Sequence, residues 1–177
     1  MSFTRLNTAN QQEVRDYAAS WKFATAGNPN HWKYFAWANG ELYKQLPDWL
    51  RTEVVDGQPY ANAAEMFEDI DRHTLKVSRE FADEHPVWNE WENIQFRLVH
   101  DWHHYLSKGK FTWVGEKLAC ASHLEALKDK VTSQLFVREV RYQQLEAVIK
   151  SECLGQTAVG ILDEKFPPQY IKEMIGV

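Results

Sequence analysis

Apolar residues recur at intervals of three and four along several stretches of the chain, the spacing that lines one face of an α-helix. The clearest pattern follows Asn62, and its positions are Met66, Ile70, His73, Val77 and Phe81. Asn62 with Glu65 three residues later matches a capping box, so we expect a helix to begin there and to stop at His85-Pro86. The next helix is predicted from about Asn89 to Leu106.

Other segments carry weaker versions of the same pattern. Helices are expected at residues 11–23, 114–127 and 131–154, with short helices and turns across residues 31–50 and a last short helix after Phe166-Pro167-Pro168. No segment alternates apolar and polar residues between hairpin turns, so no strand is expected. We therefore predict an all-α fold, a single-domain helical bundle of about six or seven helices over residues 1–177. Residues 1–60 form its aromatic-rich helical part, and residues 61–177 carry the candidate metal-site helices.

Composition narrows the classes of function. The chain has 177 residues and a formal net charge of -5, without long basic runs, so we expect no binding to duplex nucleic acid through neutralised phosphates. The start of the chain lacks the apolar core of a signal peptide, and no apolar stretch approaches the ~20 residues that span a bilayer. Cys120 and Cys153 are expected to be reduced thiols, and the expected location is the cytoplasm.

Three of the seven histidines fall within the five residues from His100 to His104. His100 and His104 are four residues apart, so one helix face can offer both imidazoles to a single metal ion. Asp101 takes the place of the glutamate in the His-Glu-x-x-His pattern, where the acid is the general base for a metal-activated water. The alternative is a hydrogen-bonded histidine pair at the edge of the core.

Three further predicted helices carry polar pairs at same-face spacing within apolar surroundings. The pairs are Asp69 with His73, Glu116 with His123, and Glu152 with Gln156. Buried polar groups of this kind must pair with one another or bind a metal. The predicted ligands of a divalent ion, zinc, iron or manganese, are His100, His104, Glu116, His123 and Glu152. The candidate catalytic residues are Asp101, Glu116 and Glu152, and the candidate substrate-binding residues are Arg97, Gln156, His73 and Asp69.

Short motifs follow one another in order over roughly the C-terminal half to two thirds of the chain. They are His85-Pro86, Asn93, Phe96-Arg97-Leu98-Val99-His100-Asp101, Phe111, Gly115-Glu116, His123 and Ser151-Glu152-Cys153-Leu154-Gly155-Gln156. This order resembles a group of uncharacterised bacteriophage-encoded proteins with no established activity. The resemblance implies that these polar residues belong to a recurring motif, and that the protein works in the cytoplasm of a host cell.

Three functions are compatible with these patterns. The first is a metal-dependent hydrolase that activates water in a helical bundle, with a nucleotide or phosphoester among its candidate small-molecule substrates. One version is a phosphohydrolase built on His73, His100-Asp101 and either Asp129 or Asp163. The second function is that of a non-haem iron or di-iron oxygenase or oxidase.

The third function is that of a non-enzymatic phage accessory protein that binds a host partner or a nucleotide. Its candidate surface comprises Trp32, Trp37 and Trp49, because exposed rings can stack on or dock against a partner. The alternative is that these rings pack in the core.

Overall fold

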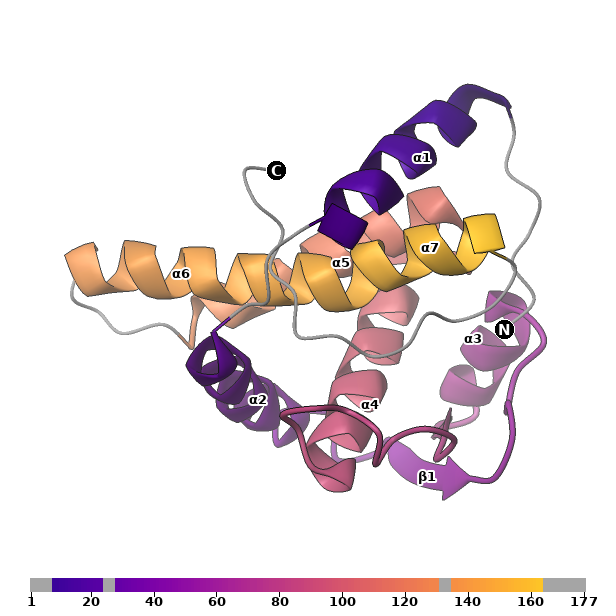
Figure 1. Ribbon diagram of the computed structural model, residues 1–177. Helices are drawn as coiled ribbons and strands as arrows, with labels where there is room; N and C mark the ends of the chain where they lie inside the picture. Colours follow the sequence, from indigo (N-terminus) through magenta and orange to yellow (C-terminus); the bar gives the residue numbers. More distant parts are fainter. Residues whose placement is uncertain (1–7, 24–27, 131–134, 164–177) are drawn as a thin grey trace.

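The computed structural model describes the backbone of residues 8–23, 28–130 and 135–163, and the side chains of residues 11–20, 28–130 and 140–162 (Figure 1). Its helices are α1 (Thr8–Phe23), α2 (Pro29–Tyr43), α3 (Ala63–Asp71), α4 (Glu90–Ser107), α5 (Trp113–Lys128), α6 (Leu135–Ile149) and α7 (Gln156–Asp163), with the π-helix η1 (Lys150–Gly155) between the last two. Its strands are β1 (Arg51–Val55) and β2 (Thr74–Ser78). The short helix expected after Phe166 lies outside the described residues.

Helices α6, η1 and α7 follow one another without a break and form one long helix, coloured orange to yellow in Figure 1. The described residues thus contain six helical rods and one small sheet, and the predicted all-α class is confirmed. The long helix passes the predicted end at Leu154 and runs through Gly155 and Gly160 to Asp163.

The two short strands were not expected from the sequence. β1 and β2 pair in parallel, from Arg51 opposite Thr74 to Val55 opposite Ser78, and α3 connects them. The prediction of a single helix from Asn62 to His85 is therefore wrong beyond Asp71. His73 adopts a left-handed backbone with φ of 67°, which ends the helical path and directs the chain into β2.

Helix α4 separates two apolar clusters. Phe96 and Val99 belong to the larger cluster, which also receives side chains from α1, α2, α5 and the long helix. Ile94 and Leu98 belong to the smaller cluster, formed with α3 and the strands. Figure 1 accordingly shows α4 between α2 on one side and α3 with β1 on the other. Polar side chains on α4 are therefore enclosed from several directions.

The N-terminus of α4 is fixed by the capping box that its sequence contains. The Asn89 side chain accepts the backbone N–H of Glu92 at 2.9 Å, and the Glu92 carboxylate accepts the backbone N–H of Asn89 at 2.8 Å. These two bonds satisfy backbone donors that a helix end leaves unpaired. In the described part of the chain, no helix combines the length and apolar character needed to cross a membrane.

Candidate metal centre

The candidate metal centre lies where the second half of α4 meets the first turn of α5. His100 and His104 project from successive turns of α4, and Glu116 projects from the start of α5. A short connection makes this approach possible: Lys108 takes a left-handed backbone with φ of 55°, and the Gly109 N–H donates to the His104 carbonyl at 2.9 Å. The chain therefore reverses within a few residues and returns Glu116 to the two histidines.

Glycine at position 115 is required for this tight return. A Cβ atom added to Gly115 would lie 1.8 Å from the Lys110 carbonyl oxygen, far inside contact distance. The Gly115 N–H also donates to the Thr112 hydroxyl at 3.2 Å, which caps α5. The Gly115-Glu116 pair thus combines a residue that permits the close approach with a residue that supplies a carboxylate.

Three side-chain atoms converge at the centre. Glu116 Oε2 lies 3.2 Å from His100 Nε2 and 3.4 Å from His104 Nε2, and the three atoms all lie within 4.8 Å of one another. The three side chains are enclosed, with exposed fractions of 12% for His100, 1% for His104 and 7% for Glu116. This group could hold a metal ion.

A backbone carbonyl orients His104 from the side opposite the centre. His104 Nδ1–H donates to the Gly109 carbonyl at 2.9 Å, while Nε2 is buried without a hydrogen bond and faces Glu116. When the ring is neutral, the proton sits on Nδ1 and the lone pair of Nε2 points into the centre. A metal-binding histidine is commonly held in this way by a carbonyl on its other nitrogen.

The electrostatics of the metal-free group are those of an ion pair. Burial opposes the charged form of His104, but the charge of Glu116 and its contact with the ring outweigh burial and raise the pKa of His104 to about 9. Burial likewise opposes ionisation of Glu116, yet His104 and His100 lower the pKa of Glu116 to about 2. Without a metal, His104 and Glu116 therefore form an imidazolium–carboxylate pair, and a metal ion would have to displace a proton.

The π-helix η1 brings two further side chains beside the centre. Cys153 Sγ lies 3.5 Å from His100 Nδ1, on the ring edge opposite Glu116. Burial, reinforced by Cys120, raises the pKa of the Cys153 thiol well above its usual value. Glu152, a predicted ligand, is buried too, but its carboxylate is not in the group of three and instead faces His85.

His123, also a predicted ligand, is placed next to the centre but not in the group of three. His123 Nε2 lies 3.0 Å from the Asn39 side-chain oxygen, and its ring stacks on His103 with centroids 4.9 Å apart. Burial lowers the pKa of His123 well below its usual value, and burial, with an electrostatic contribution from the neighbouring histidines of α4, lowers the pKa of His103 to about 4. The two stacked rings are neutral neighbours of the centre.

Asp101 and Arg97 flank the ligand histidines on α4. Burial raises the pKa of Asp101 to about 6, against the opposing electrostatic effect of the neighbouring His104 and His100. Arg97 Nη1 donates to the carbonyls of Ser78 at 2.8 Å and Glu80 at 2.9 Å, so the guanidinium ties α4 to the end of β2. Burial lowers the pKa of Arg97, an effect that the charges of Glu152 and Asp101 oppose.

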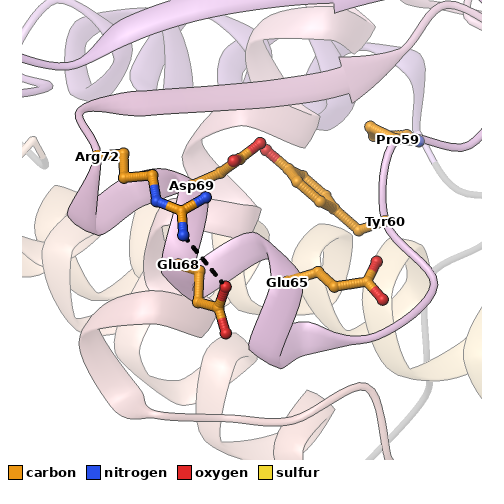
Figure 2. A pocket seen from close by; sticks show the side chains of 6 residues that line it. All are labelled: Pro59, Tyr60, Glu65, Glu68, Asp69 and Arg72. Atoms are coloured by element: carbon orange, nitrogen blue, oxygen red, sulfur yellow. Dashed lines mark ion pairs between the residues drawn. The ribbon is translucent and has the colours of Figure 1, made fainter.

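Asp69 and His73, predicted to share one helix face, do not join the centre. Asp69 forms an ion pair with Lys76 at 2.6 Å, and the exposed His73 packs against Trp49 with centroids 4.9 Å apart. Figure 2 shows Asp69 beside the Tyr60 hydroxyl in a surface pocket whose other lining residues are Pro59, Glu65, Glu68 and Arg72. None of these residues belongs to the group of three.

The remaining candidates are distributed over the fold. Gln156 is buried where α7 begins, Asp129 is the exposed C-cap of α5, and the side chain of Asp163 lies outside the described part. The candidate binding surface of three tryptophans is wrong for Trp32, which is fully buried in the core. Trp37 and Trp49 are 53% and 47% exposed.

Sequence reasoning missed the neighbours that complete the site. In the sequence, His85 marks only the expected stop of a helix and the first of the ordered motifs, and no pattern predicts the contact between Cys153 and His100. Both His85 and Cys153 lie within the ordered motifs, and this position was the available signal that they have a role beyond a turn or the apolar core.

Comparison of the chain with protein-family models, with curated proteins and with solved structures gave no match. The resemblance to bacteriophage-encoded proteins therefore stays a prediction.

Proposed function

We propose that the protein is a metal-dependent hydrolase with one zinc ion bound by His100, His104 and Glu116. The donor set of two imidazoles and one glutamate is one that catalytic zinc sites use, with the fourth position left to water. A zinc ion in such a site lowers the pKa of its water to about 7 and so supplies a nucleophile at neutral pH.

The spacing of the three donor atoms is the observation that carries this proposal. Atoms bound at the usual zinc distances occupy the corners of a tetrahedron and lie about 3.3–3.4 Å apart. The Glu116 oxygen lies 3.2 and 3.4 Å from the two imidazole nitrogens. Two of the three donor spacings therefore already suit a tetrahedral ion, and the two imidazole nitrogens lie within 4.8 Å of each other.

The surroundings of the donors support the same proposal. The Gly109 carbonyl fixes the ring of His104 from outside, so Nε2 is already directed at the ion. Two carboxyl groups outside the donor set are candidates to take a proton from water: that of Asp101, whose charge interacts with His104 and His100, and that of Glu152, which faces His85. The substrate class is then any ester, amide or phosphoester whose cleavage uses activated water.

Hydrolysis is tested with zinc-loaded protein on a panel of nucleotides, phosphoesters and carboxylic esters. We expect the wild type to lose its activity on chelation and to regain it when zinc is added. Glu116→Gln should stay inactive at the zinc concentrations that restore the wild type. His73→Ala is the matched control, because His73 is exposed and outside the group, and it should keep full activity. Equal activity in metal-free and zinc-loaded protein would contradict the proposal.

A second candidate uses the same three donors. Two histidines and one carboxylate with open positions are also the ligand set of non-haem iron oxygenases. A single ion is the version to test, because Asp69 and His73 do not reach the centre to hold a second. Iron in the purified protein, with an absorption change on exposure to oxygen, would favour this candidate; a colourless protein that carries zinc would exclude it.

A further inference from the structure

The two nitrogens of the His100 ring have different partners. Nε2 lies 3.2 Å from Glu116 Oε2, inside the group of three, and Nδ1 lies 3.5 Å from Cys153 Sγ on the opposite edge of the ring. The ring also stacks on Phe96, with centroids 5.7 Å apart and planes at 12°. Because the ring is enclosed in this way, its two polar contacts decide which nitrogen carries the proton.

The π-helix η1 places Cys153 at this edge of the ring. Its i to i+5 turn lies between α6 and α7 and rotates the side chains that follow relative to the helix before them. Cys153 is 4% exposed and belongs to the larger apolar cluster, as does Cys120 on α5. Short π-helical segments inside α-helices are frequently found at functional sites, and the contact with His100 gives this one a link to the metal centre.

The proton of the neutral His100 ring must change places when a metal ion binds. A carboxylate only accepts hydrogen bonds, so the contact with Glu116 puts the proton on Nε2 in the metal-free chain. The lone pair of Nδ1 then faces Cys153, and the S–H group donates to it. When Nε2 is bound to a metal ion, the ring proton is on Nδ1 instead, and the Cys153 sulfur is the acceptor.

A thiol suits both positions of the ring proton, whereas a carbonyl suits one. The Gly109 carbonyl, 2.9 Å from His104 Nδ1, can only accept, so it holds the proton of His104 on Nδ1 with or without metal. The S–H group of cysteine is a weak donor and its sulfur a weak acceptor, so Cys153 can serve Nδ1 of His100 in either state. His100 can therefore move its proton between its nitrogens while keeping the same neighbour.

We propose that Cys153 is the residue that positions His100 for metal binding: it donates to Nδ1 in the metal-free chain and accepts from Nδ1–H once Nε2 binds the ion. This inference rests on the metal centre of the hydrolase proposed above. Cys153 is not itself a ligand, because its sulfur meets the ring edge turned away from the group of three. Loss of a group that orients a metal ligand typically weakens metal binding by about 10–100-fold.

Zinc titration of the full chain tests the positioning role. Cys153→Ala removes the partner of Nδ1 and should weaken zinc binding by about tenfold or more. Cys120→Ala is the matched control, because it removes the other buried thiol from the same apolar cluster, and its zinc affinity should stay within about threefold of the wild type. Cys153→Ser keeps a group that both donates and accepts, so it should bind zinc at least about threefold more tightly than Cys153→Ala.

The position of the ring proton is a second measurement, and it needs no variant of Cys153. In wild type labelled with ¹⁵N-histidine, at a pH where the His100 ring is neutral, ¹⁵N chemical shifts distinguish a proton on Nε2 from one on Nδ1. We expect the proton on Nε2 in the metal-free chain and on Nδ1 with zinc bound, and His100→Gln identifies the signals. A proton already on Nδ1 in the metal-free chain would overturn the inference, even if Cys153→Ala does not fold.

The outcomes separate this inference from the metal centre itself. A zinc affinity of Cys153→Ala within about threefold of the wild type, or an equal loss in Cys120→Ala, would overturn the inference and leave the centre standing. With Co²⁺ as the probe, an intense near-ultraviolet thiolate-to-metal absorption that Cys153→Ala lacks would show a direct ligand and would also overturn it. A wild type that binds neither zinc nor Co²⁺ would contradict both proposals.

Discussion

At the scale of single residues, the metal centre depends on small backbone details as much as on its donors. Gly115 allows α5 to begin against the Lys110 carbonyl, and the Gly109 carbonyl sets the orientation of His104. The i to i+4 spacing of His100 and His104 was readable in the sequence, because helix geometry alone places them together. The contacts of Cys153 and His85 were not readable, because they depend on how η1 and a loop pack against α4.

Gly115→Ala is expected to damage the fold and the centre together. The added methyl group would overlap the Lys110 carbonyl, so we predict a loss of about 2–3 kcal/mol in the free energy of unfolding and weaker zinc binding. Gly40→Ala is the matched control: its Cβ would lie 3.6 Å from Gln95 Oε1, an ordinary contact. Because alanine favours helix, Gly40→Ala should be neutral or stabilising by up to about 1 kcal/mol. Urea denaturation measures both, and equal stability of Gly115→Ala and wild type would contradict the close approach.

The tryptophans of α2 provide a second comparison at this scale. Trp32 is fully buried and its carbonyl accepts the Trp88 indole N–H at 2.8 Å, whereas Trp37 is 53% exposed. Trp32→Ala should lower the free energy of unfolding by about 3–5 kcal/mol, and Trp37→Ala by less than about 1 kcal/mol. Similar losses in the two variants, measured by denaturant titration, would show that the assignment of Trp32 to the core is wrong.

At the scale of elements, the helical spacing of apolar residues predicted the helices well. The prediction failed where the same apolar residues also fit the two-residue period of a strand. The residues from Met66 to Val77 fit a spacing of three and four, yet Leu75 and Val77 lie in β2. A strand of five residues contains too few alternations to stand out, and its identity depends on pairing with β1 far along the chain. The π-turn η1 was also beyond sequence reasoning, since its residues continue a helical pattern on both sides.

A change in the capping box of α4 should lower the stability of the helix without changing metal binding at the centre. Asn89→Ala removes the acceptor for the Glu92 N–H and should cost about 1 kcal/mol of unfolding free energy. His100 and His104 are near the other end of the helix, so zinc affinity should remain that of the wild type. Asn89→Ser retains a capping oxygen and serves as the control. A large loss of zinc affinity in Asn89→Ala alone would mean that the centre depends on the whole length of α4.

At the scale of the whole molecule, a metal ion at this centre would join α4 to α5. A ligand that binds the folded chain alone, at a thousand times its Kd, stabilises it by about 4 kcal/mol. We therefore expect saturating zinc to raise the thermal unfolding midpoint of the wild type by roughly 10 °C, and not that of His104→Ala. Calorimetry with and without zinc measures the effect, and identical midpoints for the wild type would contradict it.

Zinc binding should also depend on pH with a definite sign. The pKa of His104 is raised to about 9 in the metal-free pair, so at pH 7 this ring carries a proton that zinc must displace. Affinity should therefore rise with pH, by about tenfold per unit below that pKa, with about one proton released per zinc. Calorimetric titrations in buffers of different ionisation enthalpy count the protons. No release at pH 7 would show that His104 is neutral before the metal arrives.

The most direct test of the account is the zinc stoichiometry of the metal-free chain, titrated to equilibrium for the wild type, Glu116→Gln, His104→Ala and the control His73→Ala. We expect one zinc ion per chain in the wild type and in His73→Ala, and a loss of at least about tenfold in affinity in Glu116→Gln and His104→Ala. A wild type that binds no zinc, or a His104→Ala protein that binds it as tightly as the wild type, would contradict the metal centre on which the account rests.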